Sequence, residues 1–280
     1  MNWQATVEPA WSLDAWRAQA RAAWEARIAP AQLAWDAGAQ AALVAAPSLR
    51  DAPRVRTGLA VPPDFLALAA RVLCHRDPGR HGLLYRVLWR IGEGERGLPA
   101  HALDADIHAL RGMEKAVRRD VHKMKAFVRF RAVPGHDDAF CAWFEPGHFI
   151  VDRVAPFFVR RFAGMRWSIL TPDRSAAWDG QALWLGPGGR RHEVPADDAG
   201  EALWCTYYAN IFNPARLNTR MMRQEMPQKY WHLLPETRLL PELVRTAGAR
   251  RQAMADRAPQ PTRRRIPART RPPHVPHRDA

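Results

Sequence analysis

The chain has 280 residues, with 42 Lys and Arg against 28 Asp and Glu, and its formal net charge of +14 favours a nucleic acid or another anionic surface as partner. Its three cysteines are scattered and form no C-x-x-C pair, which argues against a disulfide framework and a thiolate zinc site. Because no run of about 18 apolar residues occurs and the first residues, MNWQATVEPAW, have neither a charged start nor an apolar stretch, we expect a cytoplasmic protein without membrane association.

The N-terminal segment 1–46 is predicted to be a small α/β unit. A short strand precedes Ser12, whose side chain favours a helix N-cap, and residues at helical steps then indicate a helix over 13–28 that Pro30 ends. The following segment, 47–63, carries four prolines and no periodic pattern. Such a composition is typical of a linker between two units.

Two helices are predicted next, over 64–75 and 83–91, each with apolar residues three and four positions apart. The second ends at GEGERG, 92–97, which matches the G-x-G-x-x-G pattern of dinucleotide-binding proteins. That fingerprint needs a strand before the glycines and a helix that opens on them. Here a helix precedes the glycines and Pro99 follows them, so we interpret the motif as a helix-terminating turn.

The segment 106–131, DIHALRGMEKAVRRDVHKMKAFVRFR, joins an apolar stripe to a basic one. Apolar residues at steps of three and four line one face of a predicted helix: Ile107, Leu110, Met113, Val117, Val121 and Met124. Cationic or titratable residues fall on the other faces: Arg111, Lys115, Arg118, Arg119, His122 and Lys125. Four of these six form a row along roughly 16 Å of helix. Such a row suits the regularly spaced phosphates of a polyanion, and the alternative is the solvated face of an ordinary helix.

After this helix the pattern changes to period two. The segment AFVRFRAV, 126–133, alternates as a half-exposed strand does: one side carries Phe127, Arg129 and Arg131, and the other Val128, Phe130 and Ala132. We expect these two arginines to continue the basic surface onto a sheet.

Further strands are predicted along the chain. FCAWFE and HFIVDRV, 140–145 and 148–154, flank a Pro-Gly turn, and Pro156 is expected to begin a short helix. WSIL and ALWLG flank Asp179 and Gly180, a dipeptide suited to a hairpin turn.

The C-terminal part begins with a strongly apolar predicted helix over 201–212, which ends at Asn213 and Pro214. Residues 245–280 contain ten Arg against two Asp, and six of the last 22 residues are Pro. Because such a segment cannot form a core, we expect a disordered basic tail there. The main domain, 64–244, is predicted to be α+β, with an antiparallel sheet of hairpins packed with several amphipathic helices.

The usual signatures of catalysis and metal binding are missing from the sequence. It contains no HExxH, no Gly-Lys-Ser/Thr phosphate loop and no GxSxG elbow. His101, Asp104 and His108 have a spacing that metal ligands can show, but a capping aspartate explains the same pattern. We therefore expect neither a metal nor a cofactor.

Two polar motifs carry candidate catalytic residues. HRD places His75 and Asp77 at a helix end, and EPGH places Glu145 and His148 on either side of a tight turn. A carboxylate and an imidazole so close can cooperate in general acid–base chemistry. The alternative is structural, because helix ends and strand ends carry such residues without catalysis.

Aromatic residues beside a cation mark the C-terminal part of the main domain. Tyr207 lies in the apolar helix, and Lys229, Tyr230 and Trp231 follow one another in EMPQKYW. Rings beside cations can stack on bases while the cation binds phosphate. For the rings as a group we favour the alternative that they fill the core with their polar tips satisfied.

The longest motifs are RVLCHRDP, LLYRVLWRIGEGER, MEKAVRRDVHKMKAFVRFR, AWFEPGHFIV, PFFVRRFAGMRWSILTPDRSAAWDG, TYYANIFNPARLN and EMPQKYWHLLPE. Together, from about Trp11 to Leu243, they resemble a bacterial family of DNA repair or DNA metabolism proteins built on a domain of unknown function. In that family the domain often precedes a uracil-DNA glycosylase-like domain, or is encoded beside a radical SAM protein of the photoproduct-lyase type. The resemblance implies a DNA repair setting with such proteins as partners, and states no reaction.

The chain departs from the family pattern at two points. Leu233 stands where an Asn is usual, which puts a polar role at that position in doubt. The chain ends in its basic tail about where a glycosylase-like domain would begin, and no GQDPYH-like motif occurs. Uracil excision by this chain alone is therefore not expected.

We expect a DNA-binding accessory or processing factor whose basic helix and strand contact phosphates. About five neutralised phosphates would give a salt slope near −4 to −5 on duplex DNA. One alternative is an enzyme that acts on a nucleobase or the DNA backbone, with Glu145 and His148 near His75, Asp77 or Lys229 in one cleft. The other is a protein adaptor for a glycosylase or radical SAM partner.

Overall fold

The computed structural model describes residues 3–35, 49, 52–136, 138–195 and 200–256, and it shows an α+β protein. The helices are α1 (Leu13–Glu25), α2 (Pro63–Val72), α3 (Arg80–Gly92), α4 (Ala105–Phe127), α5 (Val151–Arg161), α6 (Gly200–Ile211), α7 (Thr219–Glu225) and α8 (Leu240–Ala255). The strands are β1 (Trp3–Ala5), β2 (Leu33–Trp35), β3 (Arg131–Ala132), β4 (Ala139–Trp143), β5 (Arg166–Leu170), β6 (Arg174–Trp178) and β7 (Leu183–Pro187). Within this part of the chain, no helix is both long and apolar enough to span a membrane.

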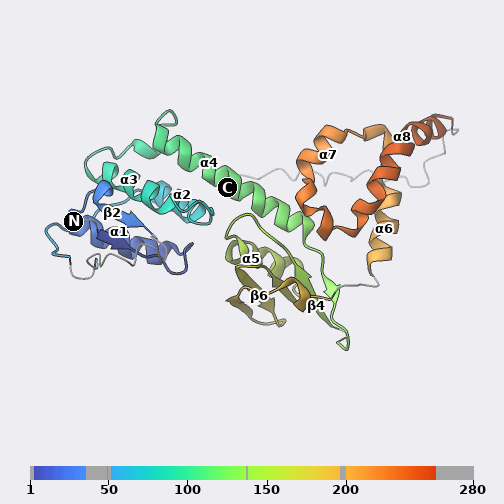
Figure 1. Cartoon of the computed structure of the whole chain (residues 1–280), viewed down its shortest axis with the longest axis horizontal. Helices are drawn as coiled ribbons and strands as arrows, with labels where there is room; N and C mark the ends of the chain where they lie inside the picture. Colours follow the sequence, from blue (N-terminus) through green and yellow to red (C-terminus); the bar gives the residue numbers. More distant parts are fainter. Residues whose placement is uncertain (1–2, 36–48, 50–51, 137, 196–199, 257–280) are drawn as a thin grey trace, which may run out of the picture.

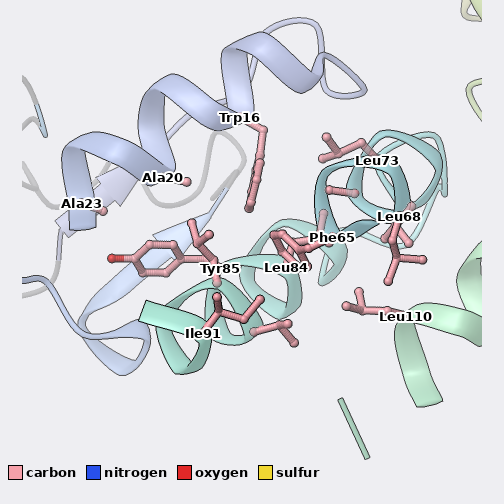
Figure 2. Close-up of a cluster of buried hydrophobic side chains, with 14 of the residues drawn as sticks. Trp16, Ala20, Ala23, Phe65, Leu68, Leu73, Leu84, Tyr85, Ile91 and Leu110 are labelled. Carbon is pink, nitrogen blue, oxygen red and sulfur yellow. The ribbon is translucent and has the colours of Figure 1, made fainter. Parts of the chain in front are cut away.

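The N-terminal core unites residues on both sides of the Pro-rich segment. Parallel strands β1 and β2 flank α1, whose first turn is capped by the Ser12 hydroxyl, an acceptor for the Ala15 N–H at 3.1 Å. Trp16 of α1 packs against Phe65 of α2, with ring centroids 6.4 Å apart. Figure 2 shows the inner face of α1 directed towards Tyr85 and other side chains of α3. These elements share one hydrophobic core.

Helix α4 connects this core to a second one, as Figure 1 shows by its course across the molecule. Asp104 caps the helix, because its side chain accepts hydrogen bonds from the N–H groups of Asp106 and Ile107. The predicted apolar stripe faces inward along the whole helix. Its N-terminal half, up to Met113, packs in the first core, whereas Val117 and the residues after it pack in the second.

The second core is covered by a five-stranded sheet in the order β3-β4-β5-β6-β7. All neighbouring strands are antiparallel except β4 and β5, which are parallel and connected through α5. The predicted Asp179–Gly180 turn joins β6 to β7, and Gly180 adopts a φ of 99°, a conformation that favours glycine. The strand expected over 126–133 is reduced to two residues at Arg131.

The strand predicted over 148–154 is wrong, because this segment enters α5, with Pro156 inside the helix. The apolar residues Val151, Val154, Ala155 and Phe158 are all buried. Their steps of three, one and three fit a helix face, so the short apolar run was compatible with both periods. A helix here provides the crossover that parallel neighbouring strands require.

The C-terminal part contains α6, α7 and α8 with short 3₁₀ turns between them, including Gln228–Leu233 and Pro235–Leu239. The prediction that disorder begins at residue 245 is wrong up to Ala255, since α8 continues to that residue. Buried Leu243 and Ala247 anchor the helix and explain its persistence. The rest of the expected tail, 257–280, lies outside the described residues.

Candidate nucleic-acid interface and imidazole cluster

The cations predicted on α4 are all exposed. We call four of these residues the α4 cationic face: Lys115, Arg118, Arg119 and His122. Among the residues that the structure describes, none of these four has an ion pair, whereas most other arginines near α4 do. The face therefore presents Lys115, Arg118 and Arg119 without an ion pair to any carboxylate of the described residues, while His122 lies within electrostatic reach of Glu225.

The two ends of the predicted basic row have partners. Arg111 forms an ion pair with Glu114 at 3.7 Å, and Glu114 also binds Arg71. The Lys125 ammonium lies 4.8 Å from the centroid of the Phe157 ring, close enough for a cation–π contact. Phosphate contact is therefore best supported for the middle of the row.

Arg129 and Arg131 do not continue the exposed basic surface, and this expectation is wrong. The Arg129 guanidinium lies 2.7 Å from the Glu236 carboxylate, and their side chains are only 18% and 4% exposed. Arg131 is buried and donates a hydrogen bond to the Pro195 carbonyl at 2.8 Å. The alternation in the sequence suggested an open face, but segments far along the chain cover it.

A second group of polar residues gathers where the loop after α2 meets the loop between β4 and α5. The imidazole rings of His75 and His148 contact each other in a tilted arrangement, with centroids 4.3 Å apart and an interplanar angle of 31°. The two loops are joined by the Phe149 N–H, which donates to the Cys74 carbonyl at 2.8 Å. The HRD and EPGH motifs, 70 residues apart in sequence, therefore meet through His75 and His148.

Asp120 of α4 holds one of these loops in place. Its buried carboxylate accepts hydrogen bonds from the His148 backbone N–H at 2.9 Å and from the Tyr230 hydroxyl at 2.8 Å. The sequence reasoning missed this residue. A signal was present, because Asp120 lies three residues after Val117 and four before Met124, on the apolar stripe itself.

The Lys229 ammonium also lies beside the loop that carries Gly147 and His148. Its Nζ lies 3.6 Å from the position that a Cβ on Gly147 would occupy, and 4.5 Å from the centroid of the Tyr230 ring. Among the residues in the described ranges, no carboxylate forms an ion pair with Lys229. We define the imidazole cluster by its residues, His75, Asp120, His148 and Lys229.

Arg76 and Asp77 support the cluster through their backbone and side chains. The Arg76 guanidinium donates to the Gly147 carbonyl at 3.1 Å and forms an ion pair with Asp173. The Asp77 carboxylate accepts from the Gly79 N–H at 2.8 Å. Both side chains thus have structural partners, and Asp77 is not placed as a free catalytic base.

Glu145 forms no hydrogen bond with His148 among the described residues, so the structure adds no support for this pair in the acid–base hypothesis. The exposed Glu145 carboxylate accepts a hydrogen bond from the Trp143 indole at 2.7 Å. In the described part of the chain, it makes no hydrogen bond to either histidine. The tight turn predicted between Glu145 and His148 directs their side chains to different partners.

The aromatic candidates are placed mainly by packing. Tyr230 is buried and its ring stacks on Phe144 at a centroid distance of 5.3 Å, so it is not available to a base. Trp231 is partly buried and its indole donates to the Met226 carbonyl at 2.9 Å. The Tyr207 side chain lies outside what the structure describes, although its backbone belongs to α6. Core filling therefore accounts for Tyr230.

Both histidines of the cluster disfavour protonation. Burial lowers the pKa of His148 to about 4, with further contributions from His75, Arg76 and Lys229, while Asp120 acts in the opposite direction. Burial also lowers the pKa of His75, with Asp77 opposing and Arg80 reinforcing the shift. At neutral pH both imidazoles are uncharged.

This pKa shift predicts a pH-dependent stability. Between the ordinary histidine pKa of 6.5 and about 4, the unfolded chain binds a proton at His148 that the folded protein does not. The free energy of unfolding should therefore fall as pH falls through this window, by less than about 1.4 kcal/mol per pH unit because solvent screens a half-buried group. Urea denaturation of the wild type and His148→Gln between pH 7.5 and 4.5 measures the difference.

The His148→Gln variant should show a shallower decline of stability than the wild type over that range. His122→Gln controls for the loss of a histidine from an exposed position of α4. Parallel curves for the wild type and His148→Gln would contradict the assignment of this pH dependence to His148.

Fold and site together define a basic α+β protein with an exposed cationic helix face and a neutral imidazole pair. The sequence profile of a domain of unknown function, DUF4130, matches residues 78–236. Because this match covers more than half of the chain, the protein belongs to the DUF4130 family. The matched region includes α4, His148 and Lys229 and begins directly after the HRD motif. Neither a curated protein nor a solved structure matches the chain significantly.

Proposed function

We propose that this protein binds DNA through the α4 cationic face and acts as an accessory or processing factor in DNA metabolism. The observation that carries the proposal is the exposure of Lys115, Arg118 and Arg119 without ion pairs within the described residues. Lys and Arg that neutralise phosphates release counterions, and this release supplies most of the affinity for nucleic acid. The net charge of +14 supports the same class of partner.

The setting in DNA repair rests on the family resemblance described above. A uracil-DNA glycosylase-like protein or a radical SAM protein is the partner class that this resemblance supports. In such a complex the present chain would hold the nucleic acid, and the partner would carry the reaction. A pure adaptor role predicts instead that the partner binds while DNA does not.

Charge reversal on α4 tests DNA binding directly. The variant Lys115→Glu/Arg118→Glu/Arg119→Glu should bind a 20-base-pair duplex more than about tenfold more weakly than the wild type, and the slope of log affinity against log salt should fall by about 2 to 3. Fluorescence anisotropy at several salt concentrations measures both quantities.

A charge-matched variant separates the face from overall charge. Arg21→Glu/Arg160→Glu/Arg220→Glu makes the same six-unit change at exposed positions of α1, α5 and α7. Its salt slope should stay within one unit of the wild-type value. Equal losses in the two triple variants would refute a role for the α4 cationic face and leave only nonspecific attraction to a basic protein.

A further inference from the structure

Two consecutive backbone amides orient both rings of the imidazole cluster. The Asp77 N–H donates to Nδ1 of His75 at 3.1 Å, and the Arg76 N–H donates to Nδ1 of His148 at 3.2 Å. Since a backbone N–H can only donate, each Nδ1 must be an acceptor. A neutral imidazole with Nδ1 as acceptor carries its hydrogen on Nε2. Both histidines are therefore fixed as Nε2–H donors.

The two Nε2–H groups are directed away from the amides that bind Nδ1, because the two nitrogens lie on different sides of each ring. Within the described residues, neither Nε2 has a hydrogen-bond partner. Both rings are partly buried, and they lie next to each other at a centroid distance of 4.3 Å. The fold thus places two oriented donors beside each other without an acceptor.

The charged groups around the rings show which partner is missing. Asp120 already accepts from Tyr230 and the His148 backbone, and the carboxylates of Asp77 and Asp173 have their own partners, Gly79 and Arg76. The Lys229 ammonium lies beside Gly147 and contributes positive potential at His148. The Asp120 carboxylate, whose Oδ2 lies the same 3.6 Å from the Gly147 Cβ position as Lys229 Nζ, is engaged by the Tyr230 hydroxyl and the His148 backbone N–H. Within the described residues, the two Nε2–H groups and the Lys229 ammonium beside His148 are therefore left as donors for an added acceptor.

We propose that His75 Nε2, His148 Nε2 and Lys229 Nζ bind a phosphate group. A phosphate has several acceptor oxygens that can receive separate donors, and charge-assisted hydrogen bonds to it are strong. An uncharged imidazole with its hydrogen on Nε2 can donate one hydrogen bond to a phosphate oxygen. The source of the phosphate is either the end of a nucleic-acid strand or free phosphate.

This site is distinct from the α4 cationic face, although one helix supports both. Arg119 and Asp120 are neighbours in α4, and neighbouring residues diverge by about 100° around a helix. Arg119 is exposed, whereas Asp120 points inward to the cluster. The proposal does not depend on DNA binding by the α4 cationic face, because it concerns a single phosphate.

Because charged groups set the pKa values of the two rings, phosphate binding should change a pKa that nuclear magnetic resonance can measure. His75, Asp120, Arg76 and Lys229 act on His148, and Asp77 and Arg80 act on His75. A bound phosphate adds negative charge beside both rings and favours their protonated forms. Saturation with phosphate should therefore raise the pKa of His148 from about 4.

Nuclear magnetic resonance of the ¹⁵N-histidine-labelled full chain tests the geometry before any ligand is added. We expect the Nε2–H tautomer for both His75 and His148 at pH 7. Titration with inorganic phosphate should then shift the Nε2 resonances of these two residues and raise the pKa of His148. An Nδ1–H tautomer at either residue, or a titration that leaves both resonances unchanged, would overturn the proposal.

The source of the phosphate is decided by matched oligonucleotides and a matched pair of variants. If a strand end is the source, a thymidine hexanucleotide with a 5′-phosphate should bind about tenfold more tightly than its 5′-hydroxyl counterpart. Lys229→Met should abolish this difference, whereas Lys125→Met, which removes an exposed lysine from α4, should preserve it. If both hexanucleotides bind equally while inorganic phosphate still shifts the two histidines, free phosphate is the source. If Lys229→Met leaves the affinity for phosphate in every form unchanged, Lys229 is not part of the site and the proposal fails.

Discussion

Replacement of Glu236 by alanine should lower the free energy of unfolding by about 3–5 kcal/mol. The carboxylate of Glu236 lies 2.7 Å from the Arg129 guanidinium, and the two side chains are 4% and 18% exposed. Removing the carboxylate takes away the charge that lies 2.7 Å from this largely buried guanidinium, and the lost compensation of a desolvated cation is the main source of the loss. Urea denaturation at pH 7 measures the change.

A double replacement distinguishes this explanation from a simple loss of packing. Glu236→Leu/Arg129→Met removes both charges and keeps most of the volume, so its stability should lie close to that of the wild type or above it. The second carboxylate oxygen, Oε2 of Glu236, is buried without a hydrogen-bond partner among the described residues, which increases the gain from removing the pair. If the double variant is as unstable as Glu236→Ala, the buried charge is not the cause.

The sequence predicted local structure well where one period was unambiguous. The stripe on α4 repeats over almost five turns, and no strand pattern competes with it, so both its buried and its exposed faces were predictable. Residues 148–154 were not predictable in this way. Val151 and Val154 fit either a strand or a helix over so short a run, and only the parallel pairing of β4 with β5 decides between them.

The residues of the candidate site were predicted better than their roles. HRD and EPGH marked His75 and His148, but nothing local to either motif states that their rings meet, because contacts between distant segments depend on the whole fold. Arg129 shows the same limit, since its partner Glu236 lies 107 residues further along the chain. Asp120 differs from these cases, because a carboxylate on an apolar helix stripe is a local signal of a buried polar contact.

Asp120 lies on α4, the helix that carries the α4 cationic face, supports the imidazole cluster and contributes to both hydrophobic cores. Helix α4 contributes its first half to the N-terminal core and its second half to the core beneath the sheet. His75 lies in the loop after α2, in the N-terminal part, whereas His148 belongs to the loop after β4. The imidazole cluster thus forms at the junction of the two cores. Its geometry depends on both, and a defect in the N-terminal core should therefore reach the cluster.

Replacement of Trp16 by alanine tests this dependence. Trp16 is 1% exposed, packs against Trp35 and Phe65, and donates its indole N–H to the His81 carbonyl. Loss of a fully buried aromatic side chain should cost about 3–5 kcal/mol of unfolding free energy. Because the core that contains Trp16 includes α2, α3 and the start of α4, the loss should appear in the unfolding of those helices and not in the first 35 residues alone.

Hydrogen exchange measured by mass spectrometry provides the readout for Trp16→Ala. Peptides from α2 and α3 should lose protection to the same extent as peptides from α1. In a separate nuclear magnetic resonance spectrum of the ¹⁵N-histidine-labelled variant, the His75 resonance should change although Trp16 lies far from it in sequence. Trp184→Ala is the matched control, because this tryptophan of β7 is 64% exposed and its loss should cost less than about 1 kcal/mol. Protection lost in α1 alone would show that the N-terminal segment is an independent unit, as its Pro-rich boundary first suggested. Protection lost in all three helices would show that this boundary lies within one cooperative core.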